Sequence, residues 1–109
     1  MSMLTTHVLD TSRGRPAVGV AVRLERPADD RVLAEAVTDE DGRVGGLGPD
    51  ELPTGPYRLI FQTGTYFAAL GQQSFYPRVA VEFEIADSGA HYHVPLLVSP
   101  YGYTTYRGS

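Results

Sequence analysis

Short segments in which every second residue is apolar recur along the chain, and turns that contain glycine or proline separate them. In the clearest segment, residues 17–26, the apolar positions are Val18, Val20, Val22 and Leu24. Successive side chains of a β-strand point to opposite faces of a sheet, so this alternation predicts a strand with one buried face. Further strands are predicted at residues 4–10, 32–38, 57–62, 79–85 and 91–98, and the tail 103–109 is rich in β-forming residues.

Other local signals predict one helix, a specific turn and an irregular strand position. Residues 65–70 are predicted to form a short helix, because Thr65 can cap its start and Gly71 can close its end. In the turn after residue 38 we expect Gly42 to take a positive φ angle. Pro95 has no N–H to donate to a ladder, so we expect it at a sheet edge or a bulge.

Taken together, these segments predict an all-β fold. Successive strands joined by short turns, with no repeated helical crossovers, are typical of an antiparallel β-sandwich. We therefore expect such a sandwich, with about seven to eight strands and one short helix. A chain of 109 residues is expected to form one domain, residues 1–109, with a single hydrophobic core.

Composition narrows the possible functions. The chain has no cysteine, so it contains neither disulfides nor a thiolate nucleophile or metal ligand. Thirteen acidic residues against nine basic ones give a net charge of −4, which argues against nucleic-acid binding. Residues 2–6 form no long apolar run, so we expect neither a signal peptide nor a membrane contact. A cytoplasmic protein is the expectation.

The polar face of the strand at residues 91–98 carries candidate chemistry. His91 and His93 are two residues apart, so their rings project from the same face and are able to share a ligand. The full candidate set comprises His7, Arg43, His93, Tyr106 and Ser109. Taken alone, each of these residues is weak support for a site, and a solvated strand face with a frayed tail explains them as well.

Two motifs change that balance. The sequence Tyr-Arg-Gly-Ser at residues 106–109, preceded by His-Tyr-His-Val-Pro-Leu-Leu at residues 91–97, closely resembles the 5-hydroxyisourate hydrolases, the transthyretin-related proteins of purine breakdown. The resemblance extends over the whole chain. It includes Thr-His-Val-Leu-Asp at residues 6–10, Thr-Asp-Glu-Asp-Gly-Arg at residues 38–43 and Phe-Tyr-Pro at residues 75–77.

The resemblance implies a fold, an activity and an assembly. It implies a transthyretin-like (prealbumin-like) sandwich that hydrolyses 5-hydroxyisourate to 2-oxo-4-hydroxy-4-carboxy-5-ureidoimidazoline, in urate degradation toward allantoin, without a cofactor. It also implies a homotetramer, a dimer of dimers with sites in the cleft between dimers. The implied catalytic residues are His7, Arg43, His93 and Ser109, and the implied substrate-binding residues are His7, Arg43 and Tyr106.

The chemistry of the substrate suits these residue types. Hydrolysis of the amide-like N1–C6 bond needs a deprotonated water, a donor for the developing oxyanion, and contacts that hold the ring. Histidine, with an ordinary pKa of about 6.5, suits the first task, and the planar donors of Arg43 suit the second. The hydroxyls of Tyr106 and Ser109 are able to hold the ring or pass a proton. The sequence has no Gly-x-Ser-x-Gly motif and no cysteine, which favours direct attack by water.

A metal site is the first alternative. His7, His91 and His93 supply three imidazoles, the number of protein ligands that a catalytic zinc requires. The positive charge of Arg43 would oppose a dication at the same place, whereas it suits an oxyanion. The family chemistry is metal-free, so no metal is expected.

Two alternatives involve no catalysis. A transthyretin-like carrier would bind a small aromatic molecule in the same cleft without turning it over, and an adhesive or structural sandwich domain would need no cleft. A carrier requires an apolar channel, but the strands here present His7, His93 and Arg43. The Tyr-Arg-Gly-Ser tail also argues against both alternatives.

Overall fold

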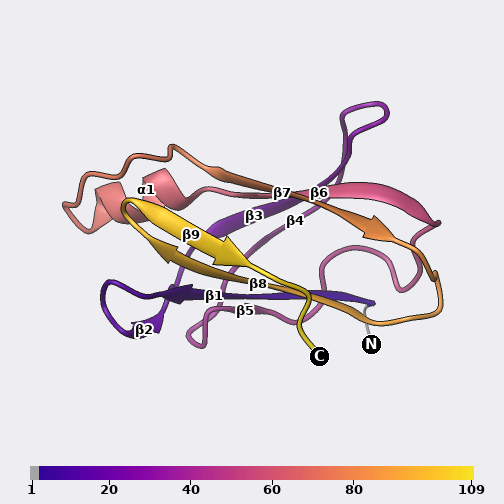
Figure 1. Cartoon of the computed structure of the whole chain (residues 1–109), viewed down its shortest axis with the longest axis horizontal. Helices are drawn as coiled ribbons and strands as arrows, with labels where there is room; N and C mark the ends of the chain where they lie inside the picture. Colours follow the sequence, from indigo (N-terminus) through magenta and orange to yellow (C-terminus); the bar gives the residue numbers. More distant parts are fainter. Residues whose placement is uncertain (1–2) are drawn as a thin grey trace.

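The computed structural model describes residues 3–109 as two β-sheets packed face to face (Figure 1). Met1 and Ser2 lie outside the described residues. Ser2 belongs to the segment 2–6, for which we expect no signal peptide. One sheet, here called the β1–β8 sheet, contains β2 (Arg15–Pro16), β1 (Leu4–Asp10), β8 (Tyr92–Ser99) and β9 (Gly102–Thr105) in that order, and β5 (Arg43–Val44) also pairs with β1. The other, the β3–β6 sheet, contains β4 (Arg31–Val37), β3 (Ala21–Arg26), β6 (Gly55–Phe61) and β7 (Val79–Ile85).

The core lies between the two sheets, as the alternation predicts. In β1 the residues at even positions are buried and those at odd positions are partly exposed. The predicted bounds of β1 and β7 agree with the structure. The segment 17–26 is predicted too long at its start, because β3 begins only at Ala21. Gly19 turns the chain there with a φ of 81°, and Val18 is 50% exposed.

The single helix, α1, spans Thr63–Ala69 and lies at one end of the sandwich (Figure 1). It begins two residues before the predicted Thr65 and has no side-chain cap at its start. It ends at Ala69, one residue before the predicted end, and the predicted closing role of Gly71 is confirmed. Gly71 has a φ of 74° and donates its N–H to the carbonyl of Ala68, and the next N–H donates to the carbonyl of Phe67. This pair of bonds is the Schellman arrangement that glycine favours.

Two short strands appear where the sequence predicts only loops, and one of them positions Arg43. The strand β5 pairs antiparallel with β1, with His7 opposite Arg43. Gly42 has a φ of 75°, as predicted, and a Cβ added to it would lie 2.4 Å from the carbonyl oxygen of Val8. Glycine is therefore required here both for the turn and for the close approach that brings β5 against β1.

The strands β1 and β8 pair in parallel, whereas the sequence predicts an antiparallel sandwich. As a consequence β8 is an interior strand, with β1 on one side and β9 on the other, and Pro95 is buried within it. The expectation of a sheet edge or a bulge is thus wrong. The β8–β9 ladder ends at Leu96, and pairing resumes with a bridge between His93 and Gly108 in the same register. The missing N–H of Pro95 falls in this gap, on the side of β8 that faces β9 and the tail. The ladder to β1, on the other side of β8, is therefore unaffected.

Candidate active site

The outer face of the β1–β8 sheet gathers most of the candidate residues. The parallel register places Thr5 beside His93 and His7 beside Pro95, and β5 adds Arg43 next to His7. Because the neighbouring positions of β1 and β8 face the core, these side chains point away from it. A pocket of about 210 Å³ opens on this face, and its lining residues are Thr5, Thr6, Arg43, Val44, Gly45, His91, His93 and Ser109.

The turn that precedes β5 holds Arg43 by its backbone. The Asp39 side chain accepts hydrogen bonds from the N–H groups of Asp41 and Arg43, both at 2.9 Å. These bonds, led by the one from Arg43, lower the pKa of Asp39. Among residues 3–109, the Arg43 guanidinium forms no ion pair. The site thus presents a guanidinium that no described carboxylate contacts at ion-pair distance, although Asp39 interacts with it electrostatically. Such a positive charge suits an anionic ligand or a developing oxyanion.

One nitrogen of His7 has a defined role. Its Nε2 lies 2.8 Å from the carbonyl oxygen of Asp41. A carbonyl oxygen only accepts hydrogen bonds, so Nε2 carries the proton and donates it. The neutral ring therefore has a bare Nδ1, which is free to accept a proton or a hydrogen bond from a ligand. His7 lies beside the pocket that Arg43 lines, in register with Arg43.

His93 is half-buried, and its ring is anchored by one nitrogen. Its Nδ1 lies 2.7 Å from Oγ1 of Thr5, which leaves Nε2 for a ligand or water. Burial lowers the pKa of His93, and the positive charges of Arg43, His7 and His91 act in the same direction, whereas a backbone contact with Thr5 opposes them. A lowered pKa keeps the ring neutral at neutral pH, which is the form that acts as a base.

The chain tail lies across His93 and brings Ser109 to the pocket. The N–H of Gly108 donates to the carbonyl of His93 at 2.8 Å. Among the residues described, Gly108 is not one of the glycines with a positive φ, so a tight bend is not the reason for glycine here. The reason is contact: a Cβ added to Gly108 would lie 2.6 Å from Cδ2 of His93.

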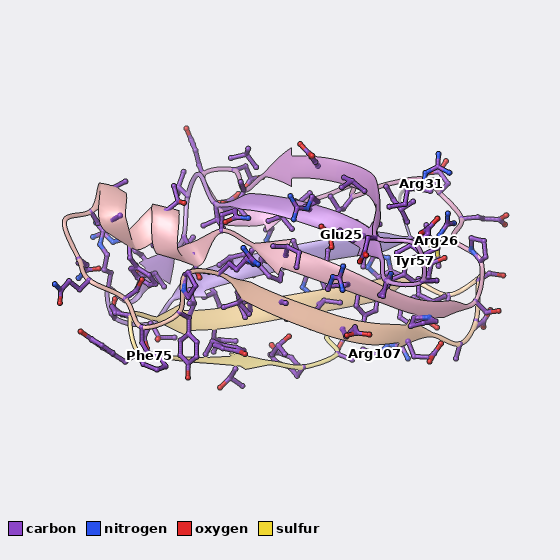
Figure 2. The ribbon with its side chains drawn as sticks, turned by 90° about the horizontal axis from the view of Figure 1, so that it is seen from above. Glu25, Arg26, Arg31, Tyr57, Phe75 and Arg107 are labelled. Carbon is purple, nitrogen blue, oxygen red and sulfur yellow. The ribbon has the colours of Figure 1, made fainter. Side chains whose placement is uncertain are left out.

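Tyr106 is the one candidate that the structure separates from the others. It is 57% exposed and lines a second groove, about 330 Å³ in volume, between β7 and the tail. In this groove the Arg107 guanidinium lies over the ring of Tyr92, 4.3 Å from its centroid, and Figure 2 shows Arg107 beside β7. A single chain therefore brings Arg43, His93 and Ser109 to one pocket, and His7 lies next to it, in register with Arg43, without lining it. Tyr106 lines a different groove.

The three-histidine metal set does not form. Within residues 3–109, no three histidine or carboxylate side chains gather closely enough to hold a metal ion. His7 is instead bonded to Asp41, while the other two rings approach the hydroxyl of Thr5. In the same part of the chain, no helix is long and apolar enough to cross a membrane.

Thr5 is a site residue that the sequence analysis missed. Its position on β1, two residues before His7, places it on the outward face. The alternation of apolar and polar residues in β1 already indicates this outward position. Its contact with His93 depends on the parallel pairing of β1 with β8, across 88 residues of sequence, which the local pattern does not reveal.

Known proteins resemble this chain in both sequence and fold. Residues 4–108 match the HIUase/Transthyretin family. The chain is 47% identical to a 5-hydroxyisourate hydrolase from Salmonella typhimurium, over 99% of this chain and 82% of the relative. It superposes on the structure of Klebsiella pneumoniae 5-hydroxyisourate hydrolase with a TM-score of 0.90 and 43% identity, covering 100% of this chain and 94% of that one. Sea bream transthyretin in complex with thyroxine gives a TM-score of 0.89 at 33% identity, covering 96% and 93%.

Proposed function

The chain belongs to the HIUase/transthyretin family, and we propose that the pocket on the outer face of its β1–β8 sheet is the active site at which it hydrolyses 5-hydroxyisourate. The activity follows from relatives of that name, 47% identical over 99% of this chain. The observation that carries the assignment of the site is Arg43, which lines the same pocket as His93 and Ser109 and, among the described residues, forms no ion pair.

The reaction uses His93 as base and Arg43 as the oxyanion partner. Nε2 of His93 takes a proton from water as the water oxygen bonds to C6 of the substrate. The C6 oxygen becomes an oxyanion, which the Arg43 guanidinium stabilises. The N1–C6 bond then breaks, the electron pair goes to N1, and His93 returns the proton to N1. The ring opens to a carboxylic acid, and no cofactor is required.

His7 and Ser109 hold the substrate ring. The bare Nδ1 of His7 accepts a hydrogen bond from a ring N–H, because its other nitrogen is already bonded to the Asp41 carbonyl. Ser109, which lines the pocket, donates its hydroxyl hydrogen to a ring oxygen. These contacts orient C6 toward the water on His93. Holding the two reacting atoms in a fixed geometry lowers the barrier of the reaction.

The alternative of a non-catalytic carrier fits the pocket less well. The sea bream relative is described in complex with thyroxine, at 33% identity to this chain. A carrier for an apolar aromatic ligand needs an apolar lining. The pocket here is lined by Arg43, two histidines, Thr5 and Ser109, and the described residues give the arginine no acidic partner.

We also propose that the single domain assembles as a homotetramer, a dimer of dimers, in the cytoplasm. Three tyrosines of the C-terminal block are exposed by 43% or more, which is unusual for a monomer surface. They are Tyr101, Tyr103 and Tyr106. Tyr106 lies outside the pocket of its own chain, so its substrate contact relies on a cleft formed between subunits. The cysteine-free sequence is in keeping with a cytoplasmic protein.

The test is the decay of freshly generated 5-hydroxyisourate followed by ultraviolet absorbance, corrected for spontaneous decay. We expect the wild type to accelerate the decay and Arg43→Ala to reduce kcat/KM by about 100-fold or more. Arg31→Ala is the matched control, because Arg31 is exposed on β4, away from the pocket. An Arg43→Ala variant that equals the control would contradict the assignment of this site.

A further inference from the structure

The Thr5 hydroxyl touches two imidazole rings at the active site. Its Oγ1 lies 2.7 Å from Nδ1 of His93 and 3.2 Å from Nε2 of His91. His93 is half-buried, whereas His91 is exposed. The three side chains therefore form a continuous hydrogen-bonded path from the inner ring, beside Arg43, to a ring in contact with solvent.

The hydroxyl restricts which nitrogens carry protons. A threonine hydroxyl donates one proton and accepts from two donors, whereas a neutral imidazole has one N–H and one bare nitrogen. Thr5 therefore donates to one ring at most. If it donates to His91, then Nδ1 of His93 carries its proton and Nε2 of His93 is a bare base. If it donates to His93, the tautomer reverses and Nε2 carries the proton.

We propose that Thr5 and His91 form a relay that moves the positive charge off His93 during the reaction, an inference that rests on the hydrolysis proposed for this pocket. A cationic His93 is disfavoured, because the ring is half-buried and faces Arg43 and His7. His91 is exposed, so water solvates a charge there at lower cost. The relay makes Thr5 and His91 positioning residues that act through His93.

The proton transfers balance over one turnover. Water gives a proton to Nε2 of His93 while Nδ1 of His93 passes its own proton to Oγ1 of Thr5, and Thr5 passes its proton to Nε2 of His91. His93 is then neutral and His91 carries the charge. When the N1–C6 bond breaks, the same path runs backward and Nε2 of His93 gives its proton to N1. All three groups return to their starting state.

Variants at Thr5 and His91 separate a relay from a structural contact. Thr5→Val keeps the shape of the side chain but removes the hydroxyl, and Thr5→Ser restores the hydroxyl. His91→Gln is able to hydrogen-bond to Thr5 but is unable to hold a charge. Thr104→Val, at an exposed position of β9, is the matched control for the threonine substitution. A thermal melt of each variant establishes that it is folded.

We expect Thr5→Val and His91→Gln each to lower kcat about tenfold or more with little change in KM, and Thr5→Ser to retain most of the activity. The variant that combines Thr5→Val with His91→Gln is expected to have nearly the same kcat as either single variant, because both substitutions break the same path. Added imidazole is expected to restore part of the kcat of His91→Ala. A folded Thr5→Val or His91→Gln variant with wild-type kcat would overturn the relay.

A second readout needs no turnover. Long-range proton–nitrogen NMR of the ring nitrogens reports the tautomer of His93, and it is recorded at pH 8 and at pH 5. Arg43 and His7 also face His93, so the comparison is made against Thr5→Val, in which both remain. We expect the His93 proton to move from Nδ1 to Nε2 in the wild type but not in Thr5→Val. An unchanged wild-type tautomer would overturn the coupling. A wild type without turnover would instead overturn the proposed function, and the NMR result would still decide the coupling.

Discussion

The backbone of Gly108 lies directly against the ring of His93. Its N–H donates to the His93 carbonyl at 2.8 Å, and an added Cβ would lie 2.6 Å from Cδ2 of the ring. The C-terminal tail is thereby attached to the strand that carries the proposed base. The same contact places Ser109 at the pocket that Arg43 lines. The absence of a side chain at Gly108 thus allows the tail to lie against the imidazole of His93.

Replacing Gly108 with alanine tests this contact. We expect Gly108→Ala to lower kcat/KM about tenfold to 100-fold, because the new methyl group displaces either the His93 ring or the tail from its position. Gly89→Ala is the control, since a Cβ there meets its nearest neighbour, Oδ1 of Asp87, at 3.4 Å, an ordinary contact. Steady-state kinetics and a thermal melt are measured for both. Equal kinetics for the two variants would show that the tail does not position His93.

The lowered pKa of His93 predicts a pH-dependent loss of stability. Burial is its main cause, so the unfolded chain binds a proton at His93 near its ordinary pKa of 6.5 while the folded chain does not. Stability from this residue is therefore lost as the pH falls through 6.5, until the folded pKa is reached. We expect the free energy of unfolding in urea to fall less from pH 8 to pH 5 in His93→Gln than in the wild type. An identical fall in both proteins would contradict the burial argument.

Metal removal is expected to leave the activity unchanged. Residues 3–109 contain no group of three histidine or carboxylate side chains that is able to hold a metal ion, and Arg43 supplies the positive charge that an oxyanion needs. The measurement is turnover before and after exhaustive dialysis against a chelator. Loss of turnover that zinc restores would assign the electrophile's role to a metal and not to Arg43.

The proposed assembly is tested by sedimentation. We expect a tetramer at micromolar concentration, because three tyrosines of the C-terminal block are exposed on the single chain. Tyr103→Ser is the informative variant, because it removes one of these three exposed aromatic rings. The ring of Tyr103 packs against Tyr76 with a centroid distance of 5.2 Å, and it remains 43% exposed. Wild-type protein that sediments as a monomer would contradict the assembly and the role of Tyr106 in a shared cleft.

Local sequence patterns predict the longer strands but not which strands pair. The alternation at residues 79–85 predicts both bounds of β7, because one face of that strand is buried and the other is solvated. The same kind of pattern is silent on the parallel pairing of β1 with β8, since alternation is identical in either direction. It also missed β2 and β5, which have only two residues each and are too short to alternate.

The candidate site shows the same division. The alternation at residues 91–98 predicts an outward face for His93, and the structure agrees. His7 also lies on the outward face of its strand. The position of Arg43 beside His7 depends on the glycine turn that folds β5 onto β1, which fixes a contact across 36 residues of sequence. Thr5 and the separation of Tyr106 from the pocket both follow from strand register, and register is a property of paired strands, not of one segment.

The most direct test of the account is the turnover of 5-hydroxyisourate by a protein that lacks residues 106–109. The deletion removes the stacking of Arg107 on Tyr92 and the bond from Gly108 to His93, but none of the buried core residues. We expect it to fold with a modest loss of stability, about 1–3 kcal/mol, and to lose turnover by about 100-fold or more. A tail-deleted protein that melts close to the wild type and keeps near-native turnover would show that the tail is structural and not part of the active site.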